Sequence, residues 1–125
     1  MKQISTDKAP SAIGPYSQAI EVNGMLFCSG QIPLNPETGK LVEGSIADQT
    51  ARVMENLKAV VEKAGGNLSN IVKTTILLKN LEDFKTVNEI YGSYFSEPYP
   101  ARATFEVARL PMDSNIEIEA IAHLS

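Results

Sequence analysis

The chain has 125 residues, 43% of them hydrophobic and 21% charged, a composition typical of a globular protein that buries one core. Eleven basic against fifteen acidic side chains give a net charge of −4 without a lysine or arginine cluster, which argues against a dedicated nucleic-acid-binding protein. One cysteine and one histidine exclude an internal disulfide and a zinc site of the Cys/His type. We expect residues 1–125 to form one domain.

The N-terminal segment lacks the features of an export signal. Residues 1–16 contain two prolines and no apolar stretch of the kind that a secretory signal needs, and no segment is apolar and long enough to cross a bilayer. The expected location is therefore the cytoplasm. The glycine fingerprints of dinucleotide-binding and phosphate-binding loops are also absent.

In chain order, the first predicted element is a β-hairpin. Residues 19–22 and 25–29 are its strands, and Asn23-Gly24 between them is a strong signal for a two-residue turn. Cys28 lies in the apolar run of the second strand, where we expect a small buried side chain and not a reactive thiol.

Two amphipathic helices are predicted. The first spans residues 45–64, with Ser45 as its cap and Gly65-Gly66 at its end, because glycine adopts the left-handed conformation of a helix C-terminus without strain. The second spans about 81–95, with Asn80 as a cap. Apolar residues recur in both at the three- and four-residue spacing of one helix face. They are Ile46, Val53, Met54, Leu57, Val60, Val61 and Ala64, and then Phe84, Val87, Tyr91, Tyr94 and Phe95.

Three further strands are predicted, over residues 71–79, 102–107 and 116–122. In the first of these, one face is expected to carry Val72, Thr74, Ile76 and Leu78. In the last, strict alternation places Ile116, Ile118, Ala120 and Ala122 on one face and Glu117, Glu119 and Ile121 on the other.

The order of these elements predicts an α+β fold, a mixed sheet covered on one face by two helices. The face without helices mixes apolar and charged side chains, as Thr75 and Leu77 alternate with Lys73 and Lys79. We expect oligomerisation to cover part of that face.

Arg102 and Glu117 are the first candidates for a functional site. The guanidinium of Arg102, held at the start of a strand, matches a carboxylate with two parallel hydrogen bonds, although a surface arginine or a structural ion pair has the same appearance in the sequence. Glu117 and Glu119 share one strand face, where a partly shielded carboxylate can act as a general base or orient a water molecule. The alternative is a face simply exposed to solvent.

Four further residues are candidates for contact with a ligand. Ser29 and Gly30 end a strand, where a glycine lets a ligand approach the backbone; a routine strand-to-turn transition is the alternative. Tyr16 either presents its hydroxyl to a ligand or anchors an irregular segment through its ring. Asn88 is either a polar contact across a subunit boundary or a surface amide of the second helix.

Six segments, in this order and spacing, make the chain similar to the RidA (YjgF) family. They are IGPYSQA, SGQIPLNP, TARVMENLKAVVEKAGG, IVKTTILLKNLEDFKTVNEIY, PAR and EVARLPMDSNIEIEAIA. The match runs from about residue 9 to residue 122, and the combination is far more specific than any one segment.

The resemblance implies a chorismate-mutase-like domain that assembles as a homotrimer with sites in the clefts between subunits. It also implies hydrolytic deamination of 2-aminoacrylate and 2-aminocrotonate, or of their tautomers 2-iminopropanoate and 2-iminobutanoate, to 2-keto acids and ammonia. In the family these substrates come from pyridoxal-phosphate-dependent serine and threonine dehydratases. Carried over motif by motif, the resemblance assigns carboxylate binding to Arg102 and water orientation to Glu117. It assigns pocket positions to Tyr16, Ser29, Gly30 and Asn88.

One departure from the family's pattern follows the PAR segment. Many members continue with Ser-Cys-Val, whereas this chain has Ala103-Thr104-Phe105, so Thr104 occupies the position of a pocket cysteine. Hydrolysis of an imine needs no thiol, because a backbone N–H at this position can still hold the substrate carboxylate. It needs no metal or organic cofactor either, because the imine carbon is already electrophilic.

Two other functions are compatible with these residues. A regulatory module could bind a 2-keto acid through Arg102 and Ser29 without turning it over, and Glu117 is the residue that distinguishes catalysis from such binding. An RNA-acting translation inhibitor is the other alternative, which the acidic composition weakens. The expected partners are therefore a small 2-imino or 2-keto acid and further copies of the chain, with no membrane and no nucleic acid.

Overall fold

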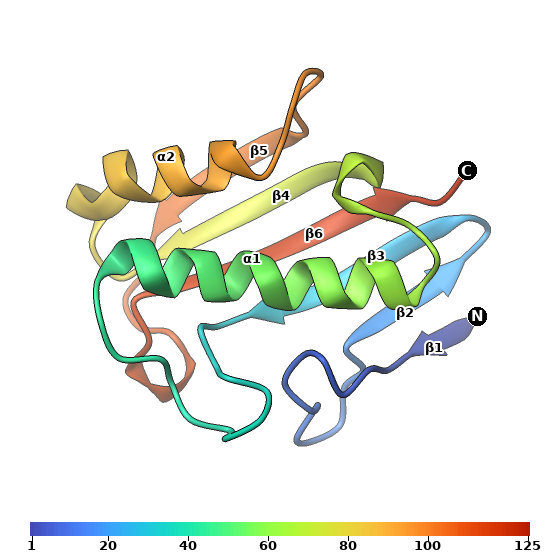
Figure 1. Cartoon of the computed structure of the whole chain (residues 1–125), viewed down its shortest axis with the longest axis horizontal. Coiled ribbons are helices and arrows are strands. Elements are labelled where there is room, and N and C mark those ends of the chain that lie inside the picture. The colour runs from blue at the N-terminus through green and yellow to red at the C-terminus, as the bar shows by residue number, and fades with distance from the viewer.

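The computed structural model describes residues 1–125 as two helices on one six-stranded sheet (Figure 1). The elements are β1 (Lys2–Ile4), β2 (Ala19–Val22), β3 (Met25–Gln31), α1 (Ile46–Lys63), β4 (Ile71–Leu78), α2 (Phe84–Ser93), β5 (Ala101–Glu106) and β6 (Ile116–His123). Short 3-10 turns occupy Leu68–Asn70, Leu81–Asp83 and Pro111–Asp113.

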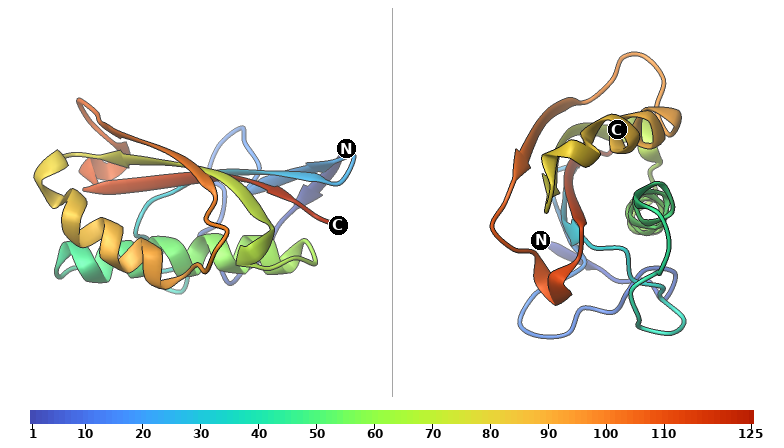
Figure 2. Two further views of the ribbon diagram at one scale, coloured as in Figure 1. Left: turned by 90° about the horizontal axis from the view of Figure 1, so that it is seen from above. Right: turned by 90° about the vertical axis from the view of Figure 1, so that its left-hand side faces the viewer.

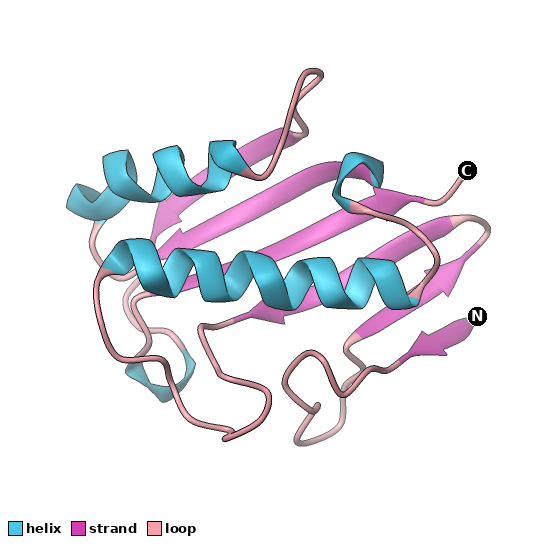
Figure 3. Ribbon diagram, viewed as in Figure 1, coloured by secondary structure: helices cyan, strands magenta, loops and turns pink.

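The sheet has the strand order β1-β2-β3-β6-β4-β5, with β5 at one edge. Only β4 and β5 run parallel; the other neighbours are antiparallel. Both α-helices lie on the same face of the sheet (Figures 2 and 3), and the edge-on views show no α-helix on the opposite face (Figure 2). The predicted α+β fold, a mixed sheet covered on one face by two helices, is confirmed.

Helix α1 forms for the reasons that its sequence indicated. The Ser45 side chain accepts a hydrogen bond from the Asp48 N–H at 3.1 Å, and Gly65 takes a φ of 93° just beyond the helix. Five residues of the predicted apolar stripe are completely buried against the sheet: Val53, Met54, Leu57, Val60 and Val61. This stripe and the inward residues of β6 make the centre of the core.

Three details differ from the sequence-based expectation. The second helix begins at Phe84, because Leu81–Asp83 form a 3-10 turn in which the Asn80 side chain accepts from the Glu82 N–H at 2.9 Å. Strand β1 was not predicted, since three residues with one buried side chain show no alternation. The placement of Val72 on the inner face of β4 was wrong. It is 45% exposed, because a register irregularity against β6 buries Ile71 in its place.

The face of the sheet without helices is partly apolar. The alternation predicted for β6 holds. Glu117, Glu119 and Ile121 lie on this face, and the residues between them point to the core and are buried. Phe27 is 46% exposed and Phe105 is 55% exposed.

No helix in the structure has the length and apolar character needed to span a membrane.

Candidate active site

The candidate residues fall into two separate clefts. Tyr16, Ser29, Gly30 and Glu117 line a cleft of about 560 Å³ between the N-terminal loop and the ends of β3 and β6. Arg102 and Asn88 line another, of about 430 Å³, between α2 and the start of β5. Each cleft thus brings together residues that are distant in the sequence, but one chain does not combine the two sets.

Glu117 is a half-buried carboxylate on β6. Burial raises its pKa above the ordinary value, and the negative charge of Glu119, two residues further along the same strand face, raises the pKa again. A carboxylate with a raised pKa is a stronger base than an ordinary glutamate, which suits a group that accepts a proton from water. The same-face placement of the two glutamates was predicted from the alternation.

Gly30 lies directly against this carboxylate. A Cβ built on Gly30 would lie 2.8 Å from the Glu117 Cδ and 2.9 Å from its Cγ, and it would overlap Oε2. The register of β3 against β6 is irregular between Cys28 and Gln31, which brings the Gly30 backbone toward the glutamate. Glycine is therefore required here by close approach and not by an unusual backbone conformation.

We expect Gly30→Ala to fold but to displace the Glu117 carboxylate, because the clashing group is a side chain that can rotate away. A displacement of about 1 Å at a reacting group costs on the order of 100-fold in rate. Circular dichroism and turnover measured on the same sample check this. Unchanged turnover would show that the position of Glu117 is unimportant.

Ser29 and Tyr16 complete the wall of the first cleft. The Ser29 hydroxyl donates to the Ser17 carbonyl at 2.6 Å, so its hydrogen is used within the protein and only its lone pairs can meet a ligand. Tyr16 is 53% exposed, on the irregular segment before β2. The structure thus gives Ser29 an anchoring contact that the sequence did not reveal.

Arg102 is held by α2 and is not part of an ion pair. Its Nη1 donates to the Asn88 Oδ1 at 2.7 Å, and its guanidinium carbon lies 5.3 Å from the centre of the Phe84 ring and 5.2 Å from that of Tyr91. The one salt bridge in the structure joins Lys79 and Asp113. The positive charge of Arg102 therefore faces the cleft without a carboxylate partner.

Phe84 and Tyr91 were not among the predicted site residues. With Asn88 they follow the spacings of four and three that place side chains on one helix face, which is the signal that would have found them. Tyr91 is buried, and its hydroxyl lies 2.7 Å from the Thr74 Oγ1. The two rings and the Asn88 amide hold the guanidinium in one orientation.

Thr104 follows Arg102 by two positions on β5. Its Oγ1 is buried and has no hydrogen-bond partner in the chain. A buried hydroxyl without a partner is unfavourable, and Thr104 lines neither of the two clefts.

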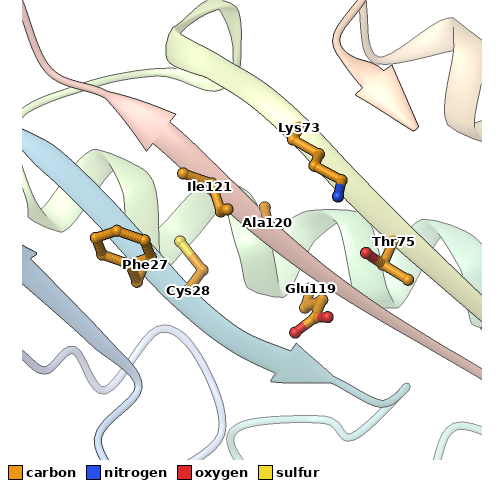
Figure 4. Close-up of a pocket in the computed structure, with 7 residues that line it drawn as sticks. All are labelled: Phe27, Cys28, Lys73, Thr75, Glu119, Ala120 and Ile121. Atoms are coloured by element: carbon orange, nitrogen blue, oxygen red, sulfur yellow. The ribbon is translucent and has the colours of Figure 1, made fainter. Parts of the chain in front are cut away.

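A smaller hollow of about 190 Å³ lies on the sheet face without helices (Figure 4). Phe27, Ile121 and Glu119 line it, together with Lys73 and Thr75 of β4. Cys28, which also borders it, is buried as predicted, and burial raises its pKa to about 12. The thiol is therefore uncharged at neutral pH and unsuited to nucleophilic attack. No group of His, Cys, Asp or Glu side chains in the structure could hold a metal ion.

Arg102 and Glu117 lie on opposite faces of the sheet. The Arg102 side chain contacts α2, on the covered face, whereas Glu117 alternates with the buried Ile116 and Ile118 and lies on the other face. Within one chain the two side chains therefore line different clefts, on different faces of the sheet.

Comparison with known proteins shows relatives along nearly the whole chain. Residues 6–124 match the family model described as Endoribonuclease L-PSP. A RutC family protein of Pyrococcus abyssi is 56% identical over 96% of this chain and 94% of its own length. The 2-iminobutanoate/2-iminopropanoate deaminase of Mus musculus is 50% identical over 97% of this chain and 90% of its own length.

Solved structures agree with these matches. RidA from an Antarctic Psychrobacter has a TM-score of 0.95 and 46% identity, covering 99% of this chain and 100% of that one. TdcF of E. coli, whose structure contains bound serine, has a TM-score of 0.95 and 45% identity, with both chains covered completely. The chain therefore belongs to the RidA family, as its sequence motifs predicted.

Proposed function

We propose that the protein is a homotrimeric deaminase that hydrolyses small 2-imino acids and their enamine tautomers to 2-keto acids and ammonia. The observation that carries the proposal is the division of the site. An unpaired arginine lies on one face of the sheet, and a half-buried glutamate lies in a cleft on the other. Deaminase names among relatives at about 50% identity support the reaction class.

Arg102 binds the substrate carboxylate in this proposal. Its fork of N–H donors matches two carboxylate oxygens, and its contacts with Phe84, Asn88 and Tyr91 fix the fork before the substrate arrives. The Thr104 hydroxyl on the same strand is buried and does not line this cleft, so at this position the proposal relies on the backbone N–H. The serine bound to TdcF, a small molecule with a carboxylate, is consistent with a substrate of this size.

Glu117 handles the proton. Its carboxylate accepts a proton from the water that attacks the imine carbon, and a carbinolamine forms. This proton passes to the imine nitrogen as the carbinolamine forms. Glu117 then takes the proton of the carbinolamine hydroxyl and transfers it to the same nitrogen, so the C–N bond breaks and ammonia leaves as the C=O bond forms. Ser29, Gly30 and Tyr16 border the cleft in which this water lies. The reaction requires no metal or organic cofactor, because the imine carbon is itself the electrophile.

The uncovered face of the sheet provides the subunit contact in this proposal. Phe27 and Phe105 are about half exposed on it, and a second copy would bury them. In the chorismate-mutase-like arrangement that we propose, three copies turn these faces inward. Each cleft containing Glu117 then meets the edge of a neighbour that carries Arg102.

Two alternative functions have some support. The family model's description names an endoribonuclease, but the net charge of −4 and the absence of a basic cluster oppose binding to RNA phosphates. A 2-keto-acid sensor would use the same arginine without turnover. The half-buried carboxylate of Glu117 favours catalysis over sensing, since a nearby negative charge does not help to bind an anion.

The decisive assay measures ammonia release from 2-aminoacrylate, generated in place by a serine dehydratase, with and without the protein. We expect a rate above the spontaneous one that rises in proportion to the protein concentration. Binding of 2-ketobutyrate without any acceleration would identify a sensor. If the protein does not accelerate ammonia release but cleaves a labelled RNA, it is a ribonuclease.

A further inference from the structure

Gln18 is a buried glutamine at the base of the Glu117 cleft, and the proposed reaction does not use it. Its side chain is 3% exposed. Its Oε1 accepts from the Thr6 N–H at 2.7 Å, and its Nε2 lies within hydrogen-bonding distance of three carbonyl oxygens: those of Thr6 (3.0 Å), Ala9 (3.4 Å) and Pro10 (2.7 Å). All of these contacts are with one loop, which lies just before the segment that carries Tyr16.

The segment between these contacts and Gln18 itself forms one wall of the cleft. Pro10, Ser11, Ile13 and Tyr16 all belong to it and line the cleft. Only two other hydrogen bonds hold this segment, one from the Tyr16 N–H to the Gly14 carbonyl and one from the Ser29 hydroxyl to the Ser17 carbonyl. Gln18 therefore closes the segment into a loop. Its side chain bonds to Pro10 at the start of the segment, and its backbone follows Ser17 at the end.

The backbone of Gln18 also reaches the opposite wall. Its carbonyl accepts from the Ser29 N–H at 3.0 Å, next to the glycine that lies against Glu117. One residue is thus bonded both to the loop that carries Tyr16 and to the strand that carries Ser29 and Gly30.

We propose that Gln18 is a positioning residue that sets the distance between Tyr16 and the Glu117 side of the cleft. The inference rests on the proposed function for its effect on turnover, but it makes a separate statement about loop geometry. A buried amide with several backbone partners holds a loop without adding charge, which suits a wall that faces a carboxylate.

The test uses Gln18→Glu, a change that keeps the size of the side chain and places a carboxylate opposite three carbonyl oxygens. We expect kcat/KM to fall about tenfold or more, because the loop that carries Tyr16 is no longer held in place. In a Tyr16→Ala background the same change should cost less than about twofold, because a residue that acts through Tyr16 has nothing left to position. If Gln18→Glu lowers kcat/KM by the same factor with and without Tyr16, the two residues act independently and the proposal is wrong. If Gln18→Glu does not fold, Gln18→Met removes the hydrogen bonds without introducing a charge.

A second measurement does not depend on activity. The chain has no tryptophan, so Tyr16→Trp makes a single fluorescent reporter on the cleft wall. We expect Gln18→Glu to lower its anisotropy and to raise its quenching by iodide. An unchanged reporter would refute the positioning role even if the protein proved to be no deaminase. Gln49→Glu is the matched control, because this amide bonds Gly44 and Asn115 outside the cleft, and it should move neither reading.

Discussion

Replacing Arg102 with alanine is expected to lower kcat/KM for 2-iminopropanoate by about 10² to 10⁴, because two charge-assisted hydrogen bonds of about 1.5–3 kcal/mol each are lost. The loss should appear chiefly in KM, since the carboxylate is bound equally in the substrate and in the transition state. The fold should persist, because the guanidinium is exposed in a cleft and not buried in the core. Steady-state kinetics at several substrate concentrations measure the effect.

Arg102→Lys tests the geometry of the contact. Lysine keeps the charge but lacks the planar pair of donors and the stacking on Phe84 and Tyr91, so it should restore little activity. Arg109→Ala is the matched control, because Arg109 is exposed and lines neither cleft. A lysine variant with nearly full activity would show that Arg102 supplies charge alone.

Glu117→Gln is expected to lower kcat by about 10² to 10⁴, the range typical of general acid–base residues. Glutamine keeps the size of the side chain and one acceptor oxygen but cannot take up a proton near neutral pH. Binding of 2-ketobutyrate, measured by calorimetry, should change little, because Arg102 still holds the carboxylate. Unchanged kcat would move the proton-handling role to another group, and Tyr16 and Glu119 are the next candidates.

Glu119→Gln separates a proton-handling glutamate from its neighbour. In the unmodified protein, turnover should slow as the pH drops through the raised pKa of Glu117, because the protonated acid cannot accept a proton. Removing the charge of Glu119 removes one of the two causes of that rise, so the acidic limb should move to lower pH while the plateau stays about the same. If the rate on the plateau of the pH profile falls strongly in Glu119→Gln, then Glu119 takes part in the reaction directly.

Much of the fold followed from local pattern. The spacing of apolar residues in α1 and their alternation in β6 predict directly which side chains are buried, because burial there depends on the face on which a residue lies. Val72 shows the limit of that reasoning, since a register irregularity between β4 and β6 shifts which residue is buried, and it depends on a strand distant in the sequence. The short β1 forms only because β2 is there to pair with it.

The site was predictable as a set of residues but not as an arrangement. Family motifs and residue chemistry pointed to Arg102 and Glu117, and their roles stay predictions. That these two side chains lie on opposite faces depends on the pairing of β5 with β4 and of β4 with β6, which no local pattern encodes. The amide of Gln18 was missed for the same reason, because a buried glutamine looks like a surface one until its partners are known.

The most direct test of the two-chain site mixes the two inactive proteins. Arg102→Ala and Glu117→Gln chains, coexpressed with different tags and purified for both, still contain one intact Arg102 and one intact Glu117 between neighbouring copies. If each site combines Glu117 of one copy with Arg102 of the next, every trimer that carries both tags should recover about a third of the unmodified activity, because one of its three sites receives both intact residues. Light scattering should give the mass of a trimer for each parent and for the mixture. Mixed trimers no more active than their parents would contradict a site shared between chains.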